Sequence, residues 1–137
     1  MRILALDYGS ARCGCAISDP TGTIATPLPA LEPPEAKAVA ELVERHEVEL
    51  VVVGMPISLG GGEGPQAAVT REFCRELERL LDVPLETHDE RFTTRQAERT
   101  ARDGAVAAED SLAAAHLLEA YLEAQAARRA REAKGDD

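Results

Sequence analysis

The first 19 residues constrain the fold most, because they read as two short strands joined by a tight turn. An apolar run from Ile3 to Leu6 is typical of a strand that is buried on both faces. Asp7 ends this run, and the turn signal YGS at 8–10 separates it from a second strand-like run at 12–18. We therefore expect a hairpin that carries a carboxylate beside its turn. Such a strand end suits a metal or phosphate site.

The composition indicates one cytoplasmic domain. A chain of 137 residues can bury one hydrophobic core, built here from Ala, Leu and Val because aromatic residues make up only 3%. No apolar run approaches the roughly 20 residues that span a bilayer. Asp7 interrupts the first apolar run too early for a signal peptide. Three cysteines, an odd number, disfavour a disulfide framework and agree with a reducing compartment.

The net charge of −10 argues against tight, non-specific binding of nucleic acid. The excess of acids lies in the middle and the last third of the chain: residues 32–82 hold eleven acids and five bases, and residues 83–137 hold twelve and eight. A local basic patch therefore remains compatible with the sequence.

Hydrophobic periodicity predicts five strands and four helices. The predicted strands are Met1–Asp7, Arg12–Ser18, Thr23–Leu28, Val48–Gly54 and Val83–His88. The predicted helices cover 35–46, 66–81, 93–102 and 110–130. This order predicts an α/β fold in which three antiparallel strands and then parallel strands form a mixed sheet flanked by helices. We expect one domain over 1–130 and a polar tail, 131–137, that frays.

Several details follow from the same patterns. Prolines at 27, 29, 33 and 34 predict a loop after the third strand. In the helix at 66–81, apolar spacing predicts inward side chains that include Val69 and Leu80. Cys13 and Cys15, on one face of the second strand, are expected in the core, as is Cys74. A core position explains these cysteines without a bound metal.

Acidic residues stand at the ends of three predicted elements: Asp7, the pair Asp89 and Glu90, and Asp110. Ligands gather at strand ends in sheets flanked by helices. Carboxylates that meet there would suit Mg²⁺ or Mn²⁺, and two such ions can activate a water for attack on a phosphodiester. Each acid also has an ordinary alternative as a turn residue, a helix-dipole partner or an N-cap. The spacing alone leaves both interpretations open.

Two further features would suit phosphate. The loop GMPISLGGGEGP at 54–65 offers backbone amides, although it lacks the Lys-Ser/Thr of a P-loop and is equally well explained as a flexible surface loop. Arg91, Arg95, Arg99 and Arg102 recur at helical spacing next to the second acidic pair. They would meet nucleic-acid phosphates or form a solvated helix face.

Four blocks in this order, LALDYGSARCGCAISD, VVVGMPISLGGGEGPQA, DERFTT and DSLAAAHLLEAYL, resemble the YqgF family of the RuvX type. Its members are described as Holliday junction resolvases and pre-16S rRNA nucleases. The resemblance covers the chain from Met1 to about Tyr121. It implies a ribonuclease H-like fold and a nucleic-acid substrate.

The resemblance also implies roles for individual residues. Asp7, Glu90 and Asp110 would be catalytic acids that hold Mg²⁺ or Mn²⁺, with Asp89 a weaker candidate ligand. The residues implied to contact substrate or support the acids are Arg12, Arg91, Thr93 and Thr94, and Arg95 joins them from the arginine stripe. The implied reaction is hydrolysis of a phosphodiester in an rRNA precursor or a branched DNA, by a monomer or a homodimer.

Two other functions compete with this one. The turn DYGSARCG resembles the phosphate loop of the actin and sugar-kinase fold, but this chain would supply only one half of that architecture. A non-enzymatic module that binds nucleic acid, the ribosome or the transcription machinery would use the same surface. The choice between DNA and RNA stays open at this point.

Overall fold

A computed structural model describes residues 1–57, 60–90 and 109–135. The strands are β1 (Ile3–Tyr8), β2 (Cys13–Ser18), β3 (Ala25–Leu31), β4 (Leu50–Met55) and β5 (Leu85–Asp89). They form one sheet in the order β3-β2-β1-β4-β5. β1, β2 and β3 pair antiparallel, whereas β4 runs parallel to β1 and β5 runs parallel to β4. The predicted mixed five-stranded sheet is therefore confirmed.

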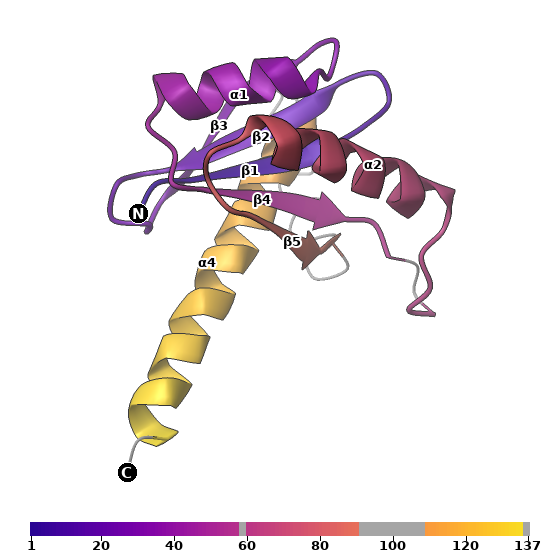
Figure 1. The fold of residues 1–137 in the computed structure, drawn as a ribbon. Helices are drawn as coiled ribbons and strands as arrows, with labels where there is room; N and C mark the ends of the chain where they lie inside the picture. Colours follow the sequence, from indigo (N-terminus) through magenta and orange to yellow (C-terminus); the bar gives the residue numbers. More distant parts are fainter. Residues whose placement is uncertain (58–59, 91–108, 136–137) are drawn as a thin grey trace.

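Helices cover both faces of this sheet (Figure 1). α1 (Ala36–Arg45) and α2 (Pro65–Leu80) lie on one face, and α4 (Glu109–Gly135) lies on the other. Side chains alternate along β1, so that Leu4 and Leu6 pack in the core under α1 and α2. Ile3 and Ala5 pack under α4. The parity of a residue in β1 therefore decides which helix layer it faces.

β3 departs from the prediction because it is an edge strand. It extends to Leu31 and so includes Pro29, which lies beyond the predicted end of the strand at Leu28, in the predicted loop. A proline has no amide hydrogen for a sheet ladder, but the outer side of an edge strand needs none. The register between β2 and β3 also shifts between Cys13 and Cys15, which accommodates an irregular stretch of β3.

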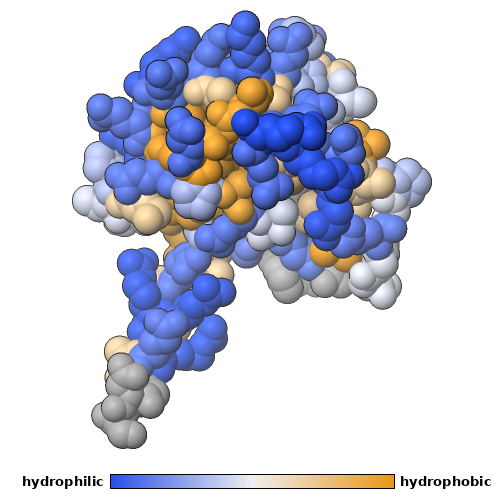
Figure 2. Space-filling model, in the orientation of Figure 1, coloured by the Kyte–Doolittle hydropathy of each residue, from blue (hydrophilic) through white to orange (hydrophobic). Residues whose placement is uncertain are grey.

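α4 is longer than predicted. It continues to Gly135, into the segment expected to fray, because the residues after Tyr121 are mostly Ala, Arg, Glu and Lys, which favour helices. Its last turns project beyond the sheet and are covered by hydrophilic side chains (Figures 1 and 2). Within the part of the chain that the structure describes, no helix has the length and apolarity needed to cross a membrane.

The buried side of α2 also differs in part from the prediction. Val69 and Leu80 are 45% and 52% exposed, whereas Thr70 and Cys74 are buried. The Thr70 hydroxyl donates to the carbonyl of Gln66 at 2.9 Å, which satisfies this polar group within the helix. The predicted core positions of all three cysteines are confirmed, and burial raises the pKa of the Cys74 thiol to about 11.

Candidate active site

The turn after β1 brings its end against β2. The amide of Gly9 donates to the carbonyl of Arg12 at 3.0 Å, and a Cβ on Gly9 would lie 2.9 Å from that oxygen. A side chain at this position would clash with the backbone, so the tight turn requires glycine. Asp7 consequently pairs with Gly14 of β2, and Arg12 lies exposed in the turn.

Asp7 lies on the α4 side of the sheet. It has the same parity in β1 as Ile3 and Ala5, which are buried under α4. Asp7 is half-buried and stands at the carboxyl end of the strand, where the apolar floor stops. The carboxyl ends of the parallel strands β4 and β5 lie at the same edge of the sheet.

The second acid on this face, Glu90, directly follows β5. The hydroxyl of Tyr121, in α4, donates to Glu86 Oε1 at 3.0 Å, and the Tyr121 ring meets the His88 ring edge-on at a centroid distance of 5.8 Å. Glu86 and His88 therefore face α4. Glu90 comes two residues after His88, so strand alternation directs it to the same face. Asp89 has the opposite parity, which assigns it to the other face of the sheet.

Glu90 reaches Asp7 across β4. Gly54 in β4 pairs with His88, and a Cβ on Gly54 would lie 2.6 Å from Glu90 Oε1 and 2.9 Å from Glu90 Cγ. The Glu90 side chain thus lies directly over Gly54. Sequence reasoning missed this glycine, although one signal was present: a glycine at the end of the most apolar strand marks a close approach of another group.

The two carboxyl groups are in contact. Burial, a side-chain hydrogen bond with Asp7, and the negative charges of Asp7 and Asp89 raise the pKa of Glu90 to about 8. These surroundings favour the protonated form of Glu90 when no cation is bound. A divalent cation would replace that proton, and oxygen donors of this kind fit Mg²⁺ or Mn²⁺.

A hydrogen bond attaches the start of α4 to β3, across the sheet from the end of β1. The buried Ser111 hydroxyl donates to the carbonyl of Leu28 in β3. Leu28 pairs with Cys15, and Cys15 pairs with Leu6, the residue before Asp7. Asp110 belongs to the first turn of α4, and its side chain lies outside the described residues.

The other predicted site residues are outside the description of the structure. These are Arg91, Thr93, Thr94 and Arg95, together with Arg99 and Arg102 of the predicted stripe. Within residues 1–57, 60–90 and 111–134, no three His, Cys, Asp or Glu side chains gather as a metal site. The structure thus brings together Asp7 and Glu90 of the predicted set.

His88 is a structural neighbour of this pair. Burial lowers the pKa of its imidazole, and the charge of Asp89 partly opposes that effect. A neutral ring at pH 7 is consistent with its edge-on packing against Tyr121. This packing fixes β5 against α4 two residues before Glu90.

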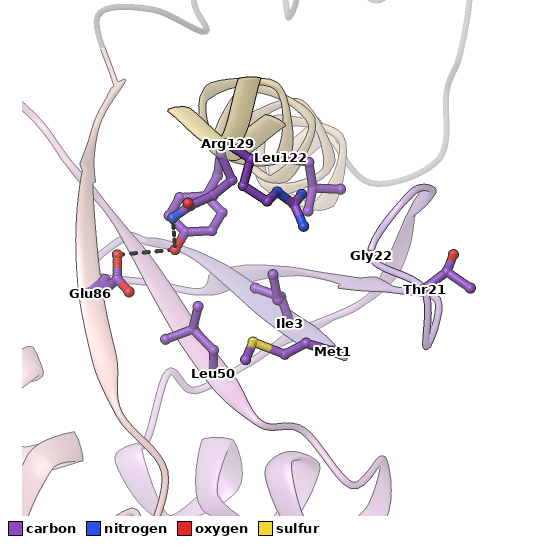
Figure 3. Close-up of a pocket in the computed structure, with 10 residues that line it drawn as sticks. Met1, Ile3, Thr21, Gly22, Leu50, Glu86, Leu122 and Arg129 are labelled. Atoms are coloured by element: carbon purple, nitrogen blue, oxygen red, sulfur yellow. Dashed lines mark hydrogen bonds between the residues drawn. The ribbon is translucent and has the colours of Figure 1, made fainter. Parts of the chain in front are cut away.

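A cavity of about 300 Å³ lies at the opposite end of the sheet (Figure 3). Ile3, Leu50 and Leu122 form apolar walls, whereas Glu86 and Arg129 add polar groups. Ile3 begins β1 and Asp7 stands near its end, so this cavity is separate from the acidic pair.

Comparisons with known proteins agree with this architecture. The family model described as "RuvX: Holliday junction resolvase" matches residues 1–124. A relative from Chloroflexus aurantiacus is 41% identical over 90% of this chain and 87% of its own length. Another from Roseiflexus sp. is 37% identical over 90% and 95%. Both are named "Putative pre-16S rRNA nuclease".

Solved structures show the same fold at low sequence identity. T. thermophilus RuvC in complex with a Holliday junction substrate has a TM-score of 0.62 at 15% identity, over 91% of this chain and 96% of that chain. The fowlpox virus resolvase in complex with Holliday junction DNA has a TM-score of 0.58 at 14% identity, over 91% and 99%. The fold is therefore ribonuclease H-like.

The family match extends over most of the sequence, and the relatives exceed 30% identity along most of both chains. The five-stranded sheet and the helices on its two faces are arranged as the resemblance implies. This chain therefore belongs to the RuvX family of phosphodiester-hydrolysing nucleases.

Proposed function

We propose that this chain is a metal-dependent endonuclease that cuts structured nucleic acid in the cytoplasm, in a single nuclease domain over residues 1–130. The proposed reactions are processing of the 5′ end of pre-16S rRNA, resolution of Holliday junctions, or both. One observation carries the proposal: Asp7 and Glu90 are in contact at the edge where parallel strands end. Ligands of α/β sheets bind at such edges.

Asp7, Glu90 and Asp110 are the proposed ligands of Mg²⁺ or Mn²⁺. Support for Asp110 comes from its neighbour Ser111, whose bond to Leu28 fixes the start of α4 level with Leu6. A bound ion would supply charge stabilisation and a water of lowered pKa. Asp89 is the weaker candidate, because strand alternation assigns it to the opposite face.

The chain's own residues would orient the reacting groups. Asp7 lies in β1 and Glu90 directly follows β5, so the sheet would hold their carboxyl groups close together before the substrate arrives. Arg12, exposed in the turn beside Asp7, is a proposed phosphate contact. Arg91, Thr93, Thr94 and Arg95 are the further proposed contacts.

The test compares cleavage of a four-way DNA junction and of a 5′-extended rRNA precursor, each with Mg²⁺ or Mn²⁺. The Asp110→Asn change keeps the size of the side chain but weakens a metal ligand. We expect wild type to cut at least one substrate and Asp110→Asn to be slower by about 100-fold or more, since metal contacts supply several kcal/mol to the transition state.

Glu119→Gln is the matched control, because it removes one negative charge from an exposed position of the same helix. It should cleave like wild type. If folded wild-type protein cuts neither substrate with either ion, the nuclease proposal is wrong for this chain. A non-enzymatic nucleic-acid or ribosome-binding module then becomes the better description.

A further inference from the structure

Gly54 occupies the central position between the two acids. β4 lies between β1 and β5 in the sheet. Val53 pairs with Leu6, and Gly54 pairs with His88, so Gly54 lies beside the end of β1 and close to the end of β5. Any group that connects Glu90 with Asp7 on the α4 face must cross this residue.

The backbone conformation at Gly54 does not require glycine. It is part of a regular strand, and the positive-φ glycines among the described residues are Gly22 and Gly61. The space above Gly54 is the constraint instead. A Cβ there would lie 2.6 Å from Glu90 Oε1, 2.9 Å from Glu90 Cγ and 3.0 Å from Leu117 Cδ2.

We propose that Gly54 is a positioning residue, whose missing side chain leaves the space in which the Glu90 carboxyl group is held against Asp7. This inference rests on the proposed nuclease function. Leu117 closes the space from the α4 side and is itself 1% exposed, so Glu90 has no room to rise over an added methyl group. An alanine at position 54 would therefore push the Glu90 carboxyl group sideways, away from Asp7.

A packing role is the alternative, since the same Cβ would also approach Leu117. The two explanations differ in which neighbour conflicts with the added methyl group. If Leu117 is the obstacle, shortening Leu117 should remove the defect. If Glu90 is the obstacle, only a change at Glu90 should do so.

The first test measures cleavage by wild type, Gly54→Ala and Gly54→Ala/Leu117→Ala. We expect kcat to fall by about 100-fold in Gly54→Ala, as a displacement near 1 Å can cost that much, with KM changed by less than about twofold. The Mn²⁺ concentration for half-maximal rate should rise, and the Leu117 change should not restore kcat. Activity of Gly54→Ala within about threefold of wild type, or its restoration by Leu117→Ala, would overturn the proposal.

The second test does not need activity. Melting temperatures are compared for wild type, Gly54→Ala, Glu90→Ala and the double variant, as a double-mutant cycle. Gly54→Ala should lower the melting temperature in wild type by a few degrees, and by less than half as much when residue 90 is alanine. Equal losses in both backgrounds would contradict contact between Glu90 and the new methyl group.

Gly60→Ala is the matched control for stability, because a Cβ on Gly60 meets nothing within 4 Å. Its melting temperature shows how much a glycine-to-alanine change alters stability through the entropy of the unfolded chain. If wild type cuts no substrate, the nuclease function fails, and the melting cycle still decides whether Gly54 makes room for Glu90.

Discussion

At the scale of single residues, two carboxyl groups that each directly follow a strand behave differently. Glu90 is buried against Asp7, and these surroundings favour its protonated form. Asp19, in the turn between β2 and β3, is surrounded by donors instead. The amides of Ile24 and Thr23, at 2.8 and 2.7 Å, and the hydroxyl of Thr21 donate to its carboxylate. Glu90 is thus a proposed cation ligand, whereas Asp19 organises a turn.

The hydrogen bonds from the Ile24 amide, the Thr21 hydroxyl and the Thr23 amide hold the pKa of Asp19 well below its usual range. A carboxyl group with a lowered pKa in the folded state stabilises the protein above its unfolded pKa, about 3.9, and loses this contribution as the pH falls. We predict that Asp19→Ala melts at a lower temperature than wild type at pH 7 and that the difference shrinks towards pH 2. A difference that stays constant over this range would contradict the prediction.

At the scale of elements, a chain of hydrogen bonds fastens α4 to the edge strand β5. Tyr121 donates to Glu86 at 3.0 Å and accepts from Gln125 Nε2 at 2.6 Å, and Tyr121 is 5% exposed (Figure 3). Glu90 directly follows β5, and Asp110 lies in the first turn of α4. This connection therefore fixes the relative position of two elements that supply proposed ligands.

Tyr121→Phe should destabilise the protein by about 1 kcal/mol or more, because it removes one donor and leaves Gln125 without this acceptor. Urea unfolding with an unchanged m-value measures the effect. Tyr8→Phe is the control, since the Tyr8 ring stacks on Phe73 on the other face of the sheet and that stacking is retained. Equal losses for the two variants would show that the Glu86–Tyr121–Gln125 chain contributes nothing specific.

The elements also show what sequence patterns can predict. The approach of Glu90 to Asp7 was predictable, because both end strands whose carboxyl ends share one edge. The role of Gly54 was not, since it depends on a side chain that arrives from another strand. The prolines of β3 misled the prediction because their tolerance depends on the position of the strand at the sheet edge. The spacing of Val69 along α2 predicts a buried side chain, but Val69 lies at the border of the buried helix face and is exposed.

At the scale of the whole molecule, Asp7 stands near the end of β1, whereas Leu122 and Arg129 of α4 lie beside Ile3 and Leu50 at the starts of β1 and β4. The last turns of α4 project beyond the sheet (Figure 1). The chain carries a net charge of −10, which repels a polyanionic substrate. A divalent cation at the Asp7–Glu90 edge would reverse this repulsion locally. Net charge therefore argues less against a nucleic-acid partner than the composition alone suggests.

We propose that Asp7 and Glu90 together bind a divalent cation. Calorimetric titration of Mn²⁺ into wild type, Glu90→Gln and Asp89→Asn tests it most directly, because the two variants remove neighbouring acids of opposite parity. We predict that Glu90→Gln weakens binding on the order of tenfold or more, since it removes a charged oxygen ligand, and that Asp89→Asn changes it by less than about threefold. Full binding by Glu90→Gln, with loss of binding in Asp89→Asn, would contradict the claim.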